Sequence, residues 1–268
     1  MKQLYFKLLM LICMIFFYAC ADSSKQKEAT PTTNEKTEKI EKSTKETQPK
    51  EKVVENTKPA FGIDISFYQG NEIDDIEKSR DSIDFIICKA TQGVSMIDPM
   101  FQKNWATIKE KGFIRGAYHF YVSTDNPLEQ AEFFIERIQD IQPNDLPPIV
   151  DIEQGGIVGN SQTPTEIQQS VLKVLKAIEE RLHIKPIIYT NTNFANMYLN
   201  NYELANYPLW IADYESKKEP VLPITWQEKG YVLWQKSDTY KILNYTNDED
   251  YFNGNLEDLK VFIENSRE

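Results

Sequence analysis

The sequence predicts an α/β fold, a TIM-like β/α barrel with five βα units followed by about three further strands. Short apolar runs alternate with helical patterns from Phe61 to about residue 201. Beyond that point strand-like runs continue while the helical patterns fade. Polar residues also end most of the apolar runs, as they do in barrels that carry a site at one end. Residues 61–268 are enough for one large domain of this kind.

Each of the first five runs is compact and largely apolar, as expected of a strand buried on both faces. They are Phe61–Ser66, Asp84–Ala90, Ile114–Phe120, Pro148–Glu153 and Lys185–Thr190. Three more follow at Pro208–Asp213, Tyr231–Gln235 and Asp250–Phe252. A doubly wound open sheet is the alternative, but no Gly-rich phosphate loop follows the first run. The pattern therefore favours the closed barrel.

Helical patterns lie between these runs, over residues 98–111, 127–141, 164–182 and 193–201. The third begins with Thr163 as a candidate N-cap, Pro164 at the first helical position, and Glu166 in place for a capping box. Its apolar side chains share one face: Ile167, Val171, Leu172, Val174, Leu175 and Ile178. This spacing predicts an amphipathic helix that covers the sheet.

Composition excludes several classes of function. With 41% hydrophobic and 26% charged residues, the chain is typical of a globular protein. Residues 61–268 carry a net charge of −14, so we expect no nucleic-acid partner, because neutralising phosphates requires a basic face. Three cysteines and two histidines are too few for a disulfide framework or a zinc centre. We expect neither metal nor cofactor.

The first sixty residues differ from the rest. Lys2 and Lys7 precede an apolar run that ends at Ala19 and is too short to span a bilayer, so residues 1–19 are expected to be an export signal. Residues 17–20 resemble a bacterial lipobox, which would make Cys20 a lipidated N-terminus; an ordinary cleaved signal with a chance cysteine is the alternative. Residues 21–60 hold nine lysines, eight acids and no aromatic residue, which predicts a disordered tether. We expect an exported lipoprotein, anchored in the membrane of a bacterial cell envelope, with residues 61–268 as its catalytic domain.

The polar residues at the ends of the predicted strands are the candidates for chemistry. They are Asp64, Ser66, Lys89, Thr91, Tyr118, His119, Asp151, Glu153, Tyr189, Asp213 and Gln235. Asp151 and Glu153 are two apart on one strand, so their side chains should project together from Cα atoms about 6.6 Å apart. One carboxyl of such a pair should have a raised pKa and serve as proton donor while the other stays charged. A glycosidase needs this division of labour.

Structural roles compete with these assignments. The carboxylates of residues 151 and 153 could instead form salt bridges through Lys89 or Arg115. Asp64 could cap a turn with Ser66, and His119 could be a general base or a packed wall residue. Five aromatic residues could stack on sugar rings or belong to the core: Tyr118, Tyr189, Trp210, Tyr214 and Trp234. Cys88, inside an apolar run, should be packing alone, and His183 should complement a helix dipole.

Six motifs, in order along residues 61–253, resemble glycoside hydrolase family 25, the lysozyme-type muramidases. They are Phe61–Gly70, Asp84–Gly93, Gly116–Phe120, Leu146–Glu153, Pro208–Asp213 and Val232–Gln235. The ordered set is far more specific than any one motif. The resemblance implies a barrel of five helices and eight strands.

The same resemblance implies hydrolysis of the β-1,4 bond between N-acetylmuramic acid and N-acetylglucosamine in peptidoglycan. We expect the protein to be a monomer. Glu153 matches the general acid of the family. Asp151 and Asp64 match carboxylates that stabilise the oxocarbenium-like charge, orient the 2-acetamido group or attack the anomeric carbon, and the sequence leaves these roles open. The substrate-binding side chains expected around them are Lys89, Tyr118, Tyr189, Trp210, Asp213, Trp234 and Gln235.

Two positions depart from the family pattern. Gln92 stands where the family often has Glu, and the further Asp expected near the last strand is only loosely matched by Asp250. A barrel that binds cell-wall glycan without cleaving it is the competing function, although all three carboxylates are present. A metal-dependent polysaccharide deacetylase would require several His ligands, and the predicted strands hold one.

Overall fold

The computed structural model describes residues 58–77, 81–159 and 162–267. The chain divides into two units, Met1–Lys52 and Val53–Glu268, and every described residue belongs to the second. The predicted export signal and Cys20 lie outside the described residues, as does the predicted tether up to residue 57. Ala60, placed at the end of that tether, is buried and bonds through its backbone to Phe252 and Gly254, so it is part of the barrel. Within the described ranges, no helix has both the length and the apolar character needed to cross a membrane.

Eight strands form a closed barrel. They follow the order β1-β9-β8-β7-β6-β5-β4-β2, and β1 also pairs with β2, which closes the ring. Their bounds are β1 Phe61–Ile65, β2 Phe85–Gln92, β4 Ile114–Phe120, β5 Ile149–Asp151, β6 Ile187–Asn191, β7 Leu209–Ala212, β8 Leu233–Ile242 and β9 Tyr245–Phe252. Seven strands run parallel and β9 is antiparallel to both of its neighbours, while a short strand, β3 (Met96–Ile97), folds back on β2. The predicted fold class is confirmed.

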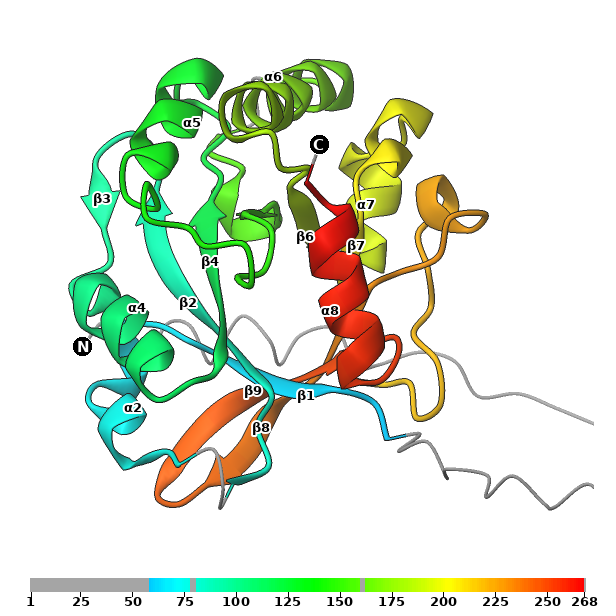
Figure 1. Ribbon diagram of the computed structural model, residues 1–268. Coiled ribbons are helices and arrows are strands. Elements are labelled where there is room, and N and C mark those ends of the chain that lie inside the picture. The colour runs from blue at the N-terminus through cyan, green and yellow to red at the C-terminus, as the bar shows by residue number, and fades with distance from the viewer. Residues whose placement is uncertain (1–57, 78–80, 160–161, 268) are drawn as a thin grey trace, which may run out of the picture. The chain divides into compact units, whose positions relative to one another are not determined.

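Helices surround this barrel on the outside (Figure 1). The α-helices are α2 Glu72–Asp75, α4 Phe101–Glu110, α5 Pro127–Ile135, α6 Pro164–Leu182, α7 Thr192–Tyr198 and α8 Leu256–Asn265. The 3-10 helices are η1 Phe67–Gln69, η2 Gln154–Gly156, η3 Tyr202–Asn206 and η4 Ile224–Trp226. The bounds of α6 agree with the predicted helix, and Thr163 and Glu166 form the predicted capping box.

The alternation of side chains along the strands separates two cores. One cluster lies between the strands and the outer helices and includes Ile63, Ile86 and Cys88. The other includes the first residues of several strands, among them Phe85 and Ile187. Two α8 side chains, Leu259 and Ile263, belong to this second cluster, so α8 packs at the amino ends of the strands. The opposite, carboxyl ends carry the polar residues.

The last third of the chain differs from the expectation in two ways. Helical patterns were expected to fade after residue 201, but α8 is a ten-residue helix with Asn255 and Asp258 in a capping box. The expected strands Tyr231–Gln235 and Asp250–Phe252 are the inner parts of a longer hairpin, β8 and β9. The hairpin was missed because its outer part is polar and interrupted by register shifts, so it lacks a continuous apolar alternation.

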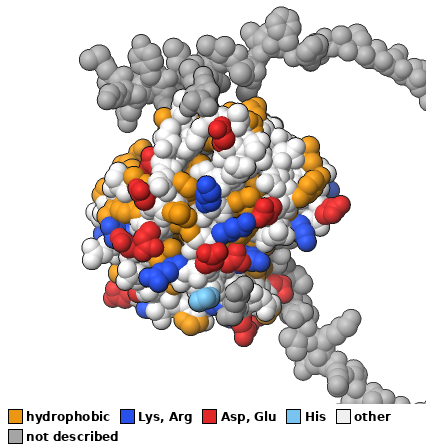
Figure 2. Space-filling view, turned by 90° about the horizontal axis from the view of Figure 1, so that it is seen from above, with side chains coloured by type: hydrophobic (Ala, Val, Ile, Leu, Met, Phe, Trp, Pro, Cys, Tyr) orange, Lys and Arg blue, Asp and Glu red, His pale blue; other side chains and the backbone are white. Residues whose placement is uncertain are grey.

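The side of the molecule that lies uppermost in Figure 1, over α5 and α6, has an ordinary solvated surface. Figure 2 shows acidic, basic and hydrophobic side chains interspersed there. Such mixing is typical of the outer faces of amphipathic helices that pack on a sheet.

Candidate active site

Inward-facing polar side chains gather where the barrel strands end. Asp64 comes from β1, Asp151 ends β5, and Glu153 follows two residues later. Lys89 of β2, Tyr118 of β4, Tyr189 of β6 and Gln235 of β8 complete the set. Residues from five or more strands therefore meet at one end of the barrel.

Gln235 joins several of these strands through its side-chain amide. Its Nε2 donates to Asp64 Oδ2 over 2.6 Å. Its Oε1 accepts from the hydroxyls of Tyr189 at 2.8 Å and Tyr214 at 2.6 Å. Because the two hydroxyls occupy the oxygen, the amide group must present its nitrogen to Asp64. This network holds Asp64 in one orientation.

Three carboxyl groups share a buried position beside this network. Asp248 and Asp250, two apart on β9, each lie within hydrogen-bonding reach of Asp64. Asp250 is fully buried, and its Oδ1 accepts from Trp210 Nε1 over 3.0 Å. Burial, followed by the charges of Asp248 and Asp250, raises the pKa of Asp64. Burial also raises the pKa of Asp248 to about 6. Burial and the mutual repulsion of the three carboxylates therefore favour their protonated forms.

Asp151 and Glu153 form the second acidic group. The backbone stays extended after β5, with φ −143° and ψ 176° at Glu153, so both side chains lie on the same side. Burial raises the pKa of both carboxyls, and the charge of Glu153 raises that of Asp151 further. Asp151 Oδ1 is buried without a hydrogen-bond partner, whereas Glu153 is half-buried. Burial and the proximity of the two carboxyl groups therefore favour a proton shared between them.

The turn after Glu153 is held tightly to the neighbouring loop. Gly156 of η2 donates to the Glu153 carbonyl and accepts from the Ser123 amide. A Cβ at position 156 would lie 2.1 Å from the Tyr121 carbonyl oxygen, so only glycine fits this close approach. Packing of η2 against the loop after β4 thus fixes the backbone position of Glu153.

Lys89 is the cation that faces the Asp151–Glu153 pair. Its Nζ donates to Gln92 Oε1 over 2.9 Å and lies 4.8 Å from the centre of the Phe120 ring. Burial lowers the pKa of Lys89, while the charges of Asp151, Asp98 and Glu153 act in the opposite direction. Gln92 is neutral, so its hydrogen bond does not neutralise the charge of Lys89, which still interacts with Asp151 and Glu153. Their pKa values are lowered in turn by Lys89.

The two tryptophans predicted to bind substrate do not fit that role. Trp210 is only 2% exposed, packs edge-on against Tyr189 and donates to Asp250. Trp234 is 5% exposed, and its Nε1 donates to the Asp213 carbonyl. A ring buried in this way cannot present its face to a sugar. Both residues support the groups that line the mouth, whereas Tyr214 and Tyr68 are exposed there.

Asp213 was also predicted to bind substrate, but its carboxylate serves its own loop. Oδ1 accepts from the amides of Glu215 and Ser216, and Oδ2 accepts from the Ser216 hydroxyl and the Val221 amide. These bonds lower the pKa of Asp213 against the opposing effect of burial. The side chain is therefore occupied in shaping the loop after β7.

The structure decides between the alternative roles of His119 and Arg115. His119 is fully buried between Thr91 and Gln130, which contact its two ring nitrogens, and burial lowers its pKa to about 4. It is a neutral packed residue and not a general base. Arg115 pairs with Asp145 at 2.8 Å and Asp140 at 3.2 Å, so it takes no part in the acidic pair at residues 151 and 153.

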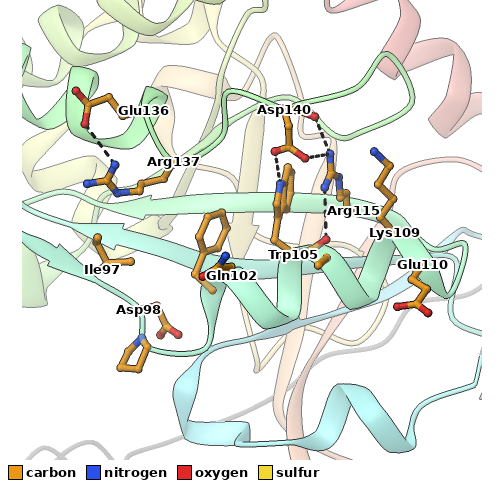
Figure 3. A pocket seen from close by; sticks show the side chains of 13 residues that line it. Ile97, Asp98, Gln102, Trp105, Lys109, Glu110, Arg115, Glu136, Arg137 and Asp140 are labelled. Atoms are coloured by element: carbon orange, nitrogen blue, oxygen red, sulfur yellow. Dashed lines mark hydrogen bonds and ion pairs between the residues drawn. The ribbon is translucent and has the colours of Figure 1, made fainter.

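A separate pocket of about 860 Å³ lies outside the barrel, beside α4. Figure 3 shows that Arg115 and Trp105 both reach Asp140 there, while Glu136 pairs with Arg137. These charged groups satisfy one another, and the carboxyl pair of the barrel mouth is absent from the lining. Among the described residues, no cluster of three or more His, Cys, Asp or Glu side chains could hold a metal ion.

Asp248 is the site residue that sequence reasoning missed. It lies two residues before Asp250 on β9, the same spacing that drew attention to Asp151 and Glu153. The signal was present, but only the antiparallel pairing of β9 with β1 brings this strand beside Asp64. Asp250, whose role was left open, is the inner member of the same cluster.

Comparison with known proteins identifies the family of the chain. The model of the family described as glycosyl hydrolases family 25 matches residues 63–245. The chain belongs to glycosyl hydrolase family 25. As a member of this family it is a glycoside hydrolase, and its barrel mouth is the place where that chemistry must be sought.

Individual relatives of this family 25 chain cover most of its length. YegX of Escherichia coli (strain K12), an uncharacterized protein, is 32% identical over 214 residues, which are 77% of this chain and 74% of YegX. The N,O-diacetylmuramidase of Chalaropsis sp is 29% identical over 216 residues, 74% of this chain and 96% of the relative. The bacterial lysozyme of Streptomyces coelicolor has a similar structure, with a TM-score of 0.69, 25% identity, and coverage of 79% of this chain and 100% of the lysozyme.

Proposed function

We propose that the protein is a muramidase that hydrolyses the β-1,4 bond between N-acetylmuramic acid and N-acetylglucosamine in peptidoglycan. Glu153 acts as the general acid and protonates the leaving oxygen. The observation that carries the proposal is the carboxyl pair of Asp151 and Glu153 at the barrel mouth, where burial raises both pKa values. A carboxyl kept protonated near neutral pH beside a second carboxylate is what glycoside cleavage requires.

The roles of the other carboxyls follow from their surroundings. Asp151, with one oxygen unpartnered and buried, is placed to orient the 2-acetamido group of the substrate or to attack the anomeric carbon. Asp64, held by Gln235, stabilises positive charge on the sugar ring as the bond breaks. Tyr118 and Tyr189 line the wall between them. All these groups come from one chain, so we propose that a monomer suffices for activity.

One experiment separates the candidate functions. Purified peptidoglycan is incubated with the full-length protein, and the released ends are reduced and identified by mass spectrometry. A muramidase leaves new reducing ends on N-acetylmuramic acid. New reducing ends on N-acetylglucosamine would overturn the bond assignment, deacetylated sugars without cleavage would indicate a deacetylase, and binding without products would indicate a glycan-binding barrel.

We expect activity to survive chelation by EDTA. The barrel mouth offers carboxyl, phenol and amide groups, and the only imidazole on its strands, His119, is bonded to Thr91 and Gln130. Tight zinc binding in a catalytic site commonly uses three protein ligands rich in His. Lysis rates should therefore be equal before and after dialysis against EDTA. Loss of activity that one added metal restores would contradict this proposal.

The N-terminal part of the proposal rests on sequence alone. We propose that residues 1–19 direct export, that Cys20 carries lipid and that residues 21–59 are a spacer between the membrane and the barrel. The protein is then a membrane-anchored lipoprotein of a bacterial cell envelope that acts on the glycan strands of peptidoglycan.

We expect Cys20→Ser to move the full-length protein from the membrane fraction to the soluble fraction, or to block its maturation. A protein truncated to begin at Lys58 should stay soluble and cleave wall fragments at the wild-type rate, because the barrel residues begin near Ala60. Fractionation and lysis assays measure both effects. Membrane retention of Cys20→Ser would show that another anchor exists, and aggregation of the truncated protein would show that the spacer packs on the barrel.

A further inference from the structure

The β8–β9 hairpin extends beyond the barrel and lies beside α2 (Figure 1). Three side-chain contacts join its returning strand to the segment that follows β1. Gln69 Nε2 donates to the Thr246 carbonyl over 3.4 Å, and the Tyr245 hydroxyl donates to Asp75 Oδ2 over 2.9 Å. Both contacts are exposed to solvent. The third contact is buried.

The buried contact joins Glu72 of α2 to Asn247 of β9. Glu72 is 0% and Asn247 1% exposed, and Asn247 Nδ2 donates to Glu72 Oε1 over 2.6 Å. The remaining oxygens, Glu72 Oε2 and Asn247 Oδ1, are both buried without a hydrogen-bond partner. Two acceptors cannot form a hydrogen bond with each other, and burying both oxygens without a donor costs free energy of folding. A proton on Glu72 Oε2 turns it into a donor for the amide oxygen.

We propose that Glu72 is a positioning residue that, while it is protonated, forms a two-bond acid–amide pair with Asn247 and thereby holds the adjacent Asp248 against Asp64. Asn247 and Asp248 are neighbours on a strand, so their side chains point to opposite sides. One side carries the buried pair, and the other carries the carboxyl cluster of the site. The part played by Asp248 in catalysis rests on the proposed function, but the pair itself does not.

The charges around Glu72 favour the protonated form. Asp74 and Asp75 lie on the same short helix, and from β9 the Tyr245 hydroxyl faces Asp75. From α4, the Lys103 ammonium binds Asn71 and Asp74. The neighbouring Lys111 binds Glu77 and the carbonyls of residues 74 and 76. These cations are thus bonded to other groups. Burial, and then the charge of Asp75, raises the pKa of Glu72 to about 7, although the Asn247 hydrogen bond lowers it.

The direction of the pH effect follows from this shift. Glu72 has a higher pKa in the closed hairpin than in an opened or unfolded one, where its ordinary value is 4.5. The stabilisation is therefore complete below pH 4.5 and is lost as the pH rises to about 7. The equilibrium constant for opening of the hairpin should increase by up to about tenfold per pH unit across this window and become constant above it.

Three variants of the full-length protein test the proposal. Glu72→Gln keeps the shape and can form both bonds to Asn247 at any pH, whereas Glu72→Ala forms neither. Tyr245→Phe is the matched control, because it removes an exposed hairpin contact without touching the buried pair. Hydrogen exchange of peptides covering residues 236–249, corrected for intrinsic rates, is followed by mass spectrometry from pH 5 to pH 8.

Protection of the hairpin should fall with pH in the wild type and in Tyr245→Phe, and should be flat in Glu72→Gln. The ratio of the wild-type kcat to that of Glu72→Gln should also fall as the pH passes 7, because the closed hairpin then loses its second bond. Equal pH dependence of protection in the wild type and Glu72→Gln would overturn the acid–amide pair. If hairpin protection depends on pH as expected but the ratio of the wild-type kcat to the Glu72→Gln kcat does not change with pH, the positioning role is overturned. Exchange needs no substrate, so it distinguishes either failure from failure of the muramidase assignment.

Discussion

Replacing Glu153 by Gln should leave a folded protein that cleaves peptidoglycan about 10²–10⁴-fold more slowly, the range that general acid catalysis contributes. The amide has nearly the shape of the carboxyl group but cannot deliver a proton to the leaving oxygen. Glu153 is half-buried and makes no side-chain capping bond to η2, so the substitution should leave the fold intact. The measurement is the initial rate of release of reducing ends from purified walls.

The matched control is Glu110→Gln at the exposed end of α4, which makes the same chemical change far from the barrel mouth. Circular dichroism and the melting temperature should be unchanged in both variants. A Glu153→Gln protein that lyses walls at more than about a tenth of the wild-type rate would show that another group supplies the proton, because the loss would fall short of the range for an acid catalyst.

Arg115→Met should lower the free energy of unfolding by about 3–5 kcal/mol, the usual cost of removing one partner of a buried ion pair. The guanidinium is 1% exposed, lies 3.6 Å from the centre of the Trp105 ring and bonds to Asp145. Removing it leaves the buried Asp145 carboxyl without its cation. Denaturation in urea, monitored by tryptophan fluorescence, gives the free energy of unfolding.

Arg137→Met is the control for this prediction, since it removes the same charge from the same pocket (Figure 3). Arg137 pairs with Glu136 at 3.3 Å, but both side chains are substantially exposed, so its removal should cost less than about 1 kcal/mol. Similar losses in the two variants would contradict the argument that burial, and not the presence of an ion pair, determines the cost.

The parts of the fold that could be predicted are those whose signals are local. The capping box of α6 and its apolar stripe lie within one stretch of chain, and they predict the bounds of that helix. The apolar runs of the parallel strands are likewise local. The outer part of the β8–β9 hairpin carries polar residues and has an irregular register, so it lacks a local signal. Its contacts with α2 join residues 170 and 175 positions apart, which no short window of sequence contains.

Sequence by itself determined that Asp151 and Glu153 project together, because the period of two along an extended chain is a property of the backbone. Closure of the barrel decided the rest of the site. It brought Gln235 to Asp64 across 171 residues and placed Asp248 and Asp250 beside them. It also buried Trp210, whereas the bonds of Asp213 are made within its own loop. Spacing along the chain specifies the side of a strand to which a residue points, but whether that residue meets solvent, substrate or another side chain depends on what the other strands place opposite it.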